Sequence, residues 1–181
     1  MDNFNQSKQN HNVKIGKAGL QDIKGIFEVQ RTTWLATYVN EKYGITAEDI
    51  KMKDFFSDQR FERWTKILSE DKALSCAWIA KNNNKVIAFC AAKKELNNRI
   101  SAIYVLPSFQ RQGLGKILIS RAIKWLGKDK DIFLDVVVYN LSAKNFYTKF
   151  GFKEISKTPI TESVKLPSGK IMPEIRMIKS L

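Results

Sequence analysis

Four segments of the chain carry apolar residues at intervals of three and four positions, the spacing that places them on one face of a helix. The first covers residues 20–38, and residues 47–68 predict one or two further helices. Residues 114–126 form the most regular of these patterns. Residues 141–150 predict a short helix that stops at Gly151, a residue type typical of helix ends.

Between these helices the apolar residues alternate with polar ones or run together, which is typical of strands. The asparagines at 82–84 favour a hairpin turn between two strands. The expected strands cover residues 13–15, 74–81, 85–94, 99–106, 131–139, 152–158 and 171–179. Their order with the helices predicts a mixed α/β (α+β) fold around one sheet, with a βαβ element inside it.

Length and composition favour one compact domain. The chain has 181 residues, of which 44% are hydrophobic, enough to bury a core. Residues 1–12 are rich in Asn and Gln and lack the apolar centre of a secretory signal. We therefore expect a disordered tail at 1–12, followed by a single domain over residues 13–181. No apolar run approaches the ~20 residues that a membrane span requires.

The scarcity of histidine and cysteine excludes several classes of enzyme. The single histidine, His11, lies in the expected tail, whereas Ser-His-Asp and Cys-His hydrolases need a histidine held in the fold. Cys76 and Cys90 have neither CxxC spacing nor a histidine at metal spacing, so no metal site is expected. Two cysteines without a pattern favour a cytoplasmic protein with reduced thiols.

The two cysteines also test the expected hairpin. If the turn is centred on Asn83, Cys76 comes directly opposite Cys90 on the neighbouring strand. This predicts two neighbouring thiols that pack as small apolar side chains and have no catalytic role. A redox switch at this pair is the alternative.

The formal net charge is +13, which attracts anions such as nucleic acid, acidic protein or a polyphosphate cofactor. A nucleic-acid-binding protein is the least favoured of the candidate functions, since the lysines are scattered and no RNP motif or helix-turn-helix signature is present. The same charge repels polycationic substrates at long range. The acidic stretch at residues 41–71 reverses this effect locally.

Residues 110–116, Gln-Arg-Gln-Gly-Leu-Gly-Lys, fall between a predicted strand and a predicted helix. The unpaired backbone N–H groups at a helix N-terminus bind phosphate, and glycines let the backbone approach it. A P-loop would need Gly in place of Gln110 and Ser or Thr in place of Ile117. A Rossmann fingerprint would need a small residue in place of Leu118. The segment therefore predicts a phosphate-binding turn of another kind.

The surroundings of this turn resemble the acetyl-CoA signature of the GCN5-related N-acetyltransferase (GNAT) superfamily. Residues 105–115 show its strand end of the V-x-P kind followed by [QR]-x-x-G-x-[GA]. The family's later N…A…FY…GF run is matched by Asn140, Ala143, Phe146, Tyr147, Gly151 and Phe152. The resemblance implies the GNAT fold, a twisted, mostly antiparallel sheet of six to seven strands flanked by helices. It also implies a splayed parallel strand pair at the acetyl-CoA site.

By this resemblance the chain is an acyl-CoA-dependent N-acetyltransferase that moves an acetyl group from acetyl-CoA to a primary amine. The backbone of Ile103 and Val105 pairs with the pantetheine arm and polarises the thioester carbonyl. Asn140 hydrogen-bonds to the same arm, and Tyr147 lies beside the CoA sulfur. The pyrophosphate rests on the backbone amides of Arg111, Gln112, Gly113, Leu114, Gly115 and Lys116.

Acetyl transfer to an amine requires a base for the amine proton and an acid for the departing thiolate. Tyr147 is the candidate acid, with aromatic packing as its alternative role. Asp135 is the candidate base, since it interrupts an apolar strand. Its place resembles that of a glutamate base in the ribosomal-protein N-terminal acetyltransferases. Glu95, Glu28 or a water chain are the alternative bases, and Asp135 then pairs with a lysine or faces outward.

Trp34 and Tyr38 lie on the first predicted helix, which in this family forms one wall of the acceptor site. Core packing is the alternative role of Trp34. A small-molecule amine and a peptide or protein amine both remain open as acceptors, as do longer acyl groups and a homodimer. The alternative function is a catalytically silent protein of the same fold that binds CoA as a sensor or binds a partner.

Overall fold

The computed structural model describes residues 13–69, 73–155, 159–160 and 163–180, so the expected tail at 1–12 lies outside the described residues. The strands are β1 (Val13–Lys17), β2 (Ser75–Asn82), β3 (Lys85–Lys93), β4 (Asn98–Val105), β5 (Ile132–Val137), β6 (Lys153–Glu154), β7 (Val164–Lys165), β8 (Ile171–Met172) and β9 (Glu174–Lys179). The α-helices are α1 (Ile23–Thr37), α2 (Ala47–Lys51), α3 (Asp58–Ser69), α4 (Leu114–Leu126) and α5 (Leu141–Thr148). No helix in these ranges is long and apolar enough to cross a membrane.

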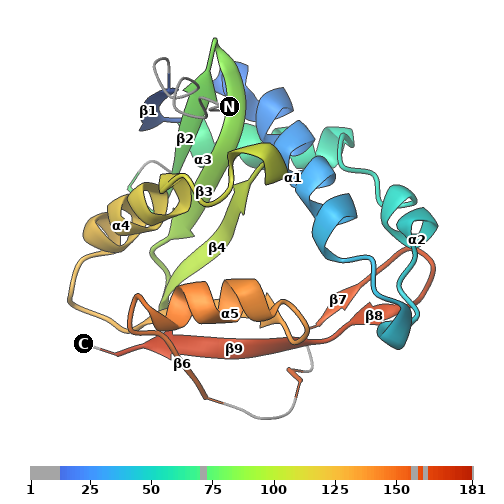
Figure 1. Ribbon diagram of the computed structural model, residues 1–181. Coiled ribbons are helices and arrows are strands. Elements are labelled where there is room, and N and C mark those ends of the chain that lie inside the picture. Colours follow the sequence, from blue (N-terminus) through green and yellow to red (C-terminus); the bar gives the residue numbers. More distant parts are fainter. Residues whose placement is uncertain (1–12, 70–72, 156–158, 161–162, 181) are drawn as a thin grey trace, which may run out of the picture.

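Seven strands form one sheet in the order β1-β2-β3-β4-β5-β9-β6, and β7 and β8 form a separate hairpin (Figure 1). Neighbouring strands of the large sheet are antiparallel except for β4 and β5, which are parallel. This pair is joined through Asn98↔Ile132 and Arg99↔Phe133, at its beginning, and the two strands separate beyond these residues. The predicted fold class, with its splayed parallel pair, is confirmed.

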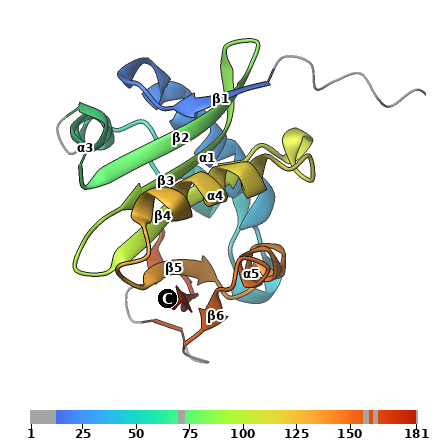
Figure 2. The same ribbon diagram turned by 90° about the vertical axis from the view of Figure 1, so that its left-hand side faces the viewer.

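Helices cover both faces of β2 and β3, and α3 and α4 lie on opposite sides of these strands (Figure 2). On one face, Leu118 and Ile119 of α4 pack into the main hydrophobic cluster. On the other face, Phe27 of α1 and Trp64 of α3 pack around Phe89 of β3. The amphipathic patterns of these helices therefore supply the two apolar layers that the sheet needs.

The two faces of β5 and β9 differ from this arrangement. Leu134, Val136, Ile175 and Met177 point into the same cluster as α4 and α5. The residues that alternate with them point to the opposite face and are partly exposed: Phe133, Asp135, Glu174 and Arg176. Charged side chains are thus concentrated on one face of the sheet, beside the place where β4 and β5 separate.

Several predicted elements differ in extent from the observed ones. The segment at 47–68 is divided into α2 and α3, because the Asp54 carboxylate accepts a hydrogen bond from the Phe56 N–H at 2.9 Å and turns the chain. The strand expected at 171–179 is divided into β8 and β9 at Pro173, which has no N–H to donate. Of the strand expected at 152–158, β6 covers Lys153–Glu154, and residues 156–158 lie outside the described part of the chain.

The register of the β2–β3 hairpin corrects the prediction for the cysteines. The turn consists of Asn83 and Asn84, whose φ angles are 47° and 65°, and the register then shifts between the pairs Lys81↔Val86 and Ala80↔Ala88, because β3 has one extra residue there. As a result Cys90 lies opposite Trp78, two residues from Cys76, and the predicted direct pairing is wrong. Both thiols are nevertheless free and buried in the same cluster, and burial raises the pKa of each.

Candidate active site

A cavity of about 990 Å³ opens where β4 and β5 separate. Residues of α1, β4, α4, β5, α5 and β9 line it, so its walls come from both faces of the sheet. Of the site residues expected from the sequence, those that line the cavity are Trp34, Tyr38, Ile103, Val105, Arg111, Gly113, Leu114, Gly115, Lys116, Asp135, Asn140 and Tyr147. The splayed strands therefore bring together two sets of residues that are far apart in the sequence.

The N-terminus of α4 forms one end of this cavity and has no side-chain cap. Its N-cap residue, Gly113, has φ 84°, and Arg111 in the preceding turn has φ 60°. The N–H groups of Leu114, Gly115 and Lys116 belong to the first helical turn, where a helix offers no carbonyl partner. Uncapped amides at the positive end of a helix dipole are typical of a binding site for a phosphate group.

Two glutamine side chains form hydrogen bonds to backbone carbonyl groups that precede this turn. The side-chain nitrogen of Gln110 donates to the Val105 carbonyl at 3.0 Å, and that of Gln112 donates to the Ser108 carbonyl at 3.1 Å. Gln112 is not among the residues that line the cavity, since its side chain folds back onto the start of the turn. The role predicted for its backbone amide stays a prediction.

The space around the glycines fits a ligand that approaches the backbone closely. A Cβ atom added to Gly113 would meet no heavy atom within 4 Å, and the positive φ disfavours any other residue there. A Cβ atom added to Gly115 would lie 3.5 Å from the Phe146 ring, an ordinary packing distance. Gly113 thus leaves open space in front of the amides, as a pyrophosphate group requires.

Two predicted residues on α5 have structural roles in addition to their place on the cavity wall. The Oδ1 atom of Asn140 caps the helix by accepting a hydrogen bond from the Ala143 N–H at 3.1 Å. The predicted bond to a pantetheine arm is therefore left to the Nδ2 group. Tyr147 is buried, with ring centroids 5.6 Å from Phe146 and 6.1 Å from Phe152. Burial raises the pKa of Tyr147 well above its usual value, so its hydroxyl stays protonated at neutral pH.

Asp135, the base predicted from the sequence, is engaged by two arginines. Arg176 donates from Nε to Oδ1 at 2.8 Å and from Nη2 to Oδ2 at 3.2 Å, and Arg99 donates from Nη2 to Oδ2. Both carboxylate oxygens already accept charge-assisted hydrogen bonds, which leaves neither one ready to take a proton from a substrate. These contacts argue against Asp135 as the general base, and its partners are arginines where the sequence suggested a lysine.

Glu174, the first residue of β9, is a better-placed base. It lines the cavity and lies opposite Val137 of β5. Burial raises the pKa of Glu174 to about 7, Asp135 adds to this rise, and Arg99 and Arg176 oppose it. The negative charge of Glu174 in turn adds to the raised pKa of Tyr147, after the larger effect of burial, and both residues line the same cavity. A carboxyl group with this pKa can take up protons near neutral pH.

Sequence reasoning missed Glu174, although the last strand carried a signal. Alternation along β9 places Glu174 and Arg176 on the face opposite Ile175 and Met177, as it does for Asp135 in β5. The alternation of residues along β9 does not reveal that β9 lies beside β5 in the sheet. Glu28 and Glu95, the weaker alternatives, are exposed and do not line the large cavity.

Trp34 and Tyr38 form an aromatic wall with Tyr104, on the same face of the sheet as Glu174. The Trp34 Nε1 group donates to the Tyr104 hydroxyl at 2.9 Å, and Tyr38 is also hydrogen-bonded to Tyr104. Both Trp34 and Tyr38 are buried in a hydrophobic cluster as well, so packing and cavity lining coincide. On the same wall, Thr33 Oγ1 is the one buried side-chain polar atom without a hydrogen-bond partner in the described chain.

Comparisons with known proteins agree with this fold. The sequence matches the acetyltransferase (GNAT) family over residues 23–152. Similar solved structures include the PaiA N-acetyltransferase from Thermoplasma acidophilum in complex with coenzyme A (20% identity, TM-score 0.68, 94% of this chain and 99% of that one). They also include the ribosomal-protein alanine N-acetyltransferase from Escherichia coli (20% identity, TM-score 0.62, 93% and 95%). A GNAT acetyltransferase from Streptococcus pneumoniae is similar as well (17% identity, TM-score 0.66, 94% and 100%). A comparison with curated protein sequences gives no match.

Proposed function

Because this chain belongs to the acetyltransferase (GNAT) family, we propose that it transfers the acetyl group of acetyl-CoA to a primary amine within a ternary complex. One observation carries the proposal: a single cavity connects the uncapped start of α4 with Glu174 through the gap between β4 and β5. One end of that cavity suits a polyphosphate and the other offers a base. A direct transfer needs both substrates to be held side by side in this way.

Acetyl-CoA supplies a thioester carbonyl that an amine can attack. Backbone amides from Arg111 to Lys116 hold its pyrophosphate at the start of α4. Ile103 and Val105 pair with the pantetheine arm along the edge of β4 that β5 leaves open, and the Nδ2 group of Asn140 donates to the same arm. The PaiA enzyme, which has a similar fold, was solved in complex with coenzyme A, and this supports acetyl-CoA as the acyl donor. The net charge of +13 favours a polyanionic substrate as well.

Glu174 acts as the general base and Tyr147 as the general acid of the reaction. Glu174 takes the proton that the amine nitrogen loses as the C–N bond forms. Since burial raises its pKa to about 7, this carboxyl group can both lose and take up a proton near neutral pH. Tyr147 donates a hydrogen bond to the sulfur as the C–S bond breaks. Its proton passes to the thiolate, and because burial disfavours a tyrosinate, the phenolate oxygen regains a proton from protonated Glu174 or from water before the next turnover.

The amine reaches the thioester from the face of the sheet opposite α4 and α5. Trp34, Tyr38 and Tyr104 form the wall on that side, and their aromatic surface excludes water from the reacting groups. Thr33 Oγ1 offers the acceptor a buried hydrogen-bonding atom.

A panel of amines tests the proposal by the release of CoA thiol from acetyl-CoA. It contains simple alkylamines, polyamines, amino acids and short peptides, and mass spectrometry identifies each product. We expect at least one amine to accelerate thiol release and to be recovered as its acetamide. Binding of acetyl-CoA without release by any amine would support the silent, CoA-binding alternative and would refute the proposal.

A further inference from the structure

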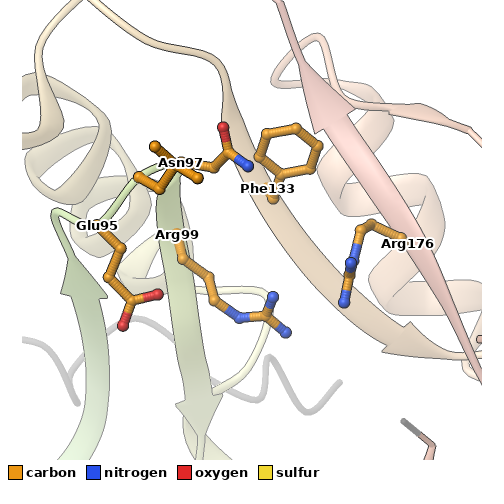
Figure 3. A pocket seen from close by; sticks show the side chains of 6 residues that line it. Glu95, Asn97, Arg99, Phe133 and Arg176 are labelled. Atoms are coloured by element: carbon orange, nitrogen blue, oxygen red, sulfur yellow. The ribbon is translucent and has the colours of Figure 1, made fainter. Parts of the chain in front are cut away.

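A second, smaller cavity lies at the beginning of the parallel strand pair. It has a volume of about 190 Å³ and is lined by Glu95, Leu96, Asn97, Arg99, Phe133 and Arg176. Arg99 lines the large cavity as well, so its side chain lies on the boundary between the two. Figure 3 shows the side chains of Arg99 and Arg176 reaching from β4 and β9 toward the same space, with the Phe133 ring between the two strands and apart from the guanidinium groups.

Positive charge prevails around this small cavity. Arg99 and Arg176 share the single carboxylate of Asp135. Glu95 is exposed and pairs with Lys93 at 3.5 Å. Glu174 is a further carboxyl group near the two arginines, and both of them act on its pKa. The side chains that line the cavity thus include two positive charges and one negative charge, which favours an anion there.

The Asp135 contact positions the Arg99 guanidinium without using all of its donors. A guanidinium group carries five N–H donors in a fixed plane. Within the described residues, Arg99 makes one hydrogen bond, from Nη2 to Asp135, and its side chain is 32% exposed. The remaining donors suit a carboxylate, which matches the planar geometry of the group.

On the basis of the proposed function, we propose that the acceptor is a small amine that also bears a carboxylate. Arg99, with Arg176 beside it, binds the carboxylate, and the amino group of the same molecule lies at Glu174. Both arginines influence the pKa of Glu174, so the anion site and the base are near neighbours. The pairing of Asp135 then serves substrate recognition by holding Arg99 in place, in addition to tying β5 to β4 and β9.

Matched pairs of acceptors test this inference. Glycine, β-alanine and a four-carbon ω-amino acid are each compared with the corresponding carboxamide, with kcat/KM expressed per unprotonated amine. In the wild-type protein we expect the best acid to exceed its amide by roughly 10- to 100-fold, as for a charge-assisted pair of hydrogen bonds. Arg99→Gln should remove most of this preference, so that the acid and its amide react at similar rates.

Arg63→Gln on α3 is the matched control, because it removes the same charge from an exposed residue that lines neither cavity. Its acid-to-amide ratio should equal that of the wild type. Arg99→Lys, which keeps the charge but loses the planar fork, should give an intermediate ratio. It also provides the test if thermal unfolding shows that Arg99→Gln does not fold.

The outcomes separate this inference from the function on which it rests. Equal rates for acids and amides in the wild type, or an unchanged ratio in folded Arg99 variants, would overturn the inference. Acetylation of other amines would then leave the proposed function standing, with the arginines acting only as a structural link between strands. If no amine of any kind is acetylated, the proposed function itself is refuted.

Discussion

The two ends of the large cavity are built in different ways. The end at α4 consists mainly of backbone: amide groups and Gly113 from one short segment of the chain. The opposite end consists of side chains from several separate elements, among them Trp34 of α1, Tyr104 of β4, Asp135 of β5 and Glu174 of β9. The end that suits acetyl-CoA is thus encoded locally, whereas the acceptor end exists only after the sheet has assembled.

The largest effect is expected at the backbone end. Gly113→Val places a β-branched residue at φ 84° and a side chain in the open space before the amides. Acetyl-CoA at 100 times its Kd should stabilise the wild type by about 2.7 kcal/mol, and this stabilisation should vanish in the variant. Thermal unfolding with and without acetyl-CoA measures it.

Gly169→Val is the matched control, because Gly169 has φ 85° and open space around it, and it lies in the β7–β8 turn outside the cavity. This variant should lose stability from backbone strain but keep the full stabilisation by acetyl-CoA. A full ligand-induced shift in Gly113→Val would mean that the phosphate site lies elsewhere.

The next largest effect is expected where the two ends meet. Tyr147→Phe removes the hydroxyl that donates to the leaving sulfur and should lower kcat by about 10²-fold, within the range for a general acid. Acetyl-CoA affinity should change little, since the ring remains between Phe146 and Phe152. Tyr43→Phe, at an exposed tyrosine outside the cavity, should leave kcat unchanged. A normal kcat in Tyr147→Phe, with chemistry rate-limiting, would assign Tyr147 to packing alone.

A smaller effect is expected on the aromatic wall of the acceptor end. Trp34→Phe removes the donor to the Tyr104 hydroxyl while keeping an aromatic ring in the cluster. Because the Tyr104 hydroxyl loses the partner that positions it in this wall, we expect KM for the amine to rise by roughly 3- to 10-fold, with unchanged acetyl-CoA affinity. Steady-state kinetics with each substrate varied separately distinguish an effect on the amine from an effect on acetyl-CoA. A change confined to acetyl-CoA would show that this wall does not contact the acceptor.

The smallest effect concerns Asn140, where the observed helix cap and the proposed ligand contact are combined. Asn140→Ala should cost about 1 kcal/mol of stability through loss of the helix cap. Asn140→Asp keeps the capping oxygen but loses the Nδ2 donor, so it should retain the stability and weaken acetyl-CoA binding a few-fold. Denaturant unfolding and acetyl-CoA titration of both variants test the two roles separately. An unaltered affinity in Asn140→Asp would limit Asn140 to the cap.

How well the sequence predicted each element depends on what the element needs. The expected bounds of α4 agree with the structure because its apolar spacing reports burial on one face directly. The turn at 110–116 was likewise predictable, since its glycines and the following helix are adjacent in the chain. The register of β2 and β3 was not predictable, because one extra residue in a strand shifts every pair that follows it.

The acceptor end was harder to predict for a related reason. Asp135 stood out in the sequence as a charge in an apolar strand, but its partners Arg99 and Arg176 come from strands on either side of β5. Only the strand order shows that these arginines form hydrogen bonds with Asp135 and that Glu174 lies near them. Chemistry that depends on strand neighbours needs the tertiary structure.

The pH dependence of kcat/KM in the wild type and in Glu174→Gln tests most directly that a base from β9 serves the acceptor end. The wild type should show a rising limb with a midpoint at about pH 7, because Glu174 must lose its proton to act. The variant should lack this limb, keep the one set by the amine itself and fall in rate by about 10²-fold. Because a raised carboxyl pKa destabilises the folded state above that pKa, Glu174→Gln should be at least as stable as the wild type at pH 8. An unchanged limb near pH 7 in a folded Glu174→Gln would contradict the assignment and leave the base to another group.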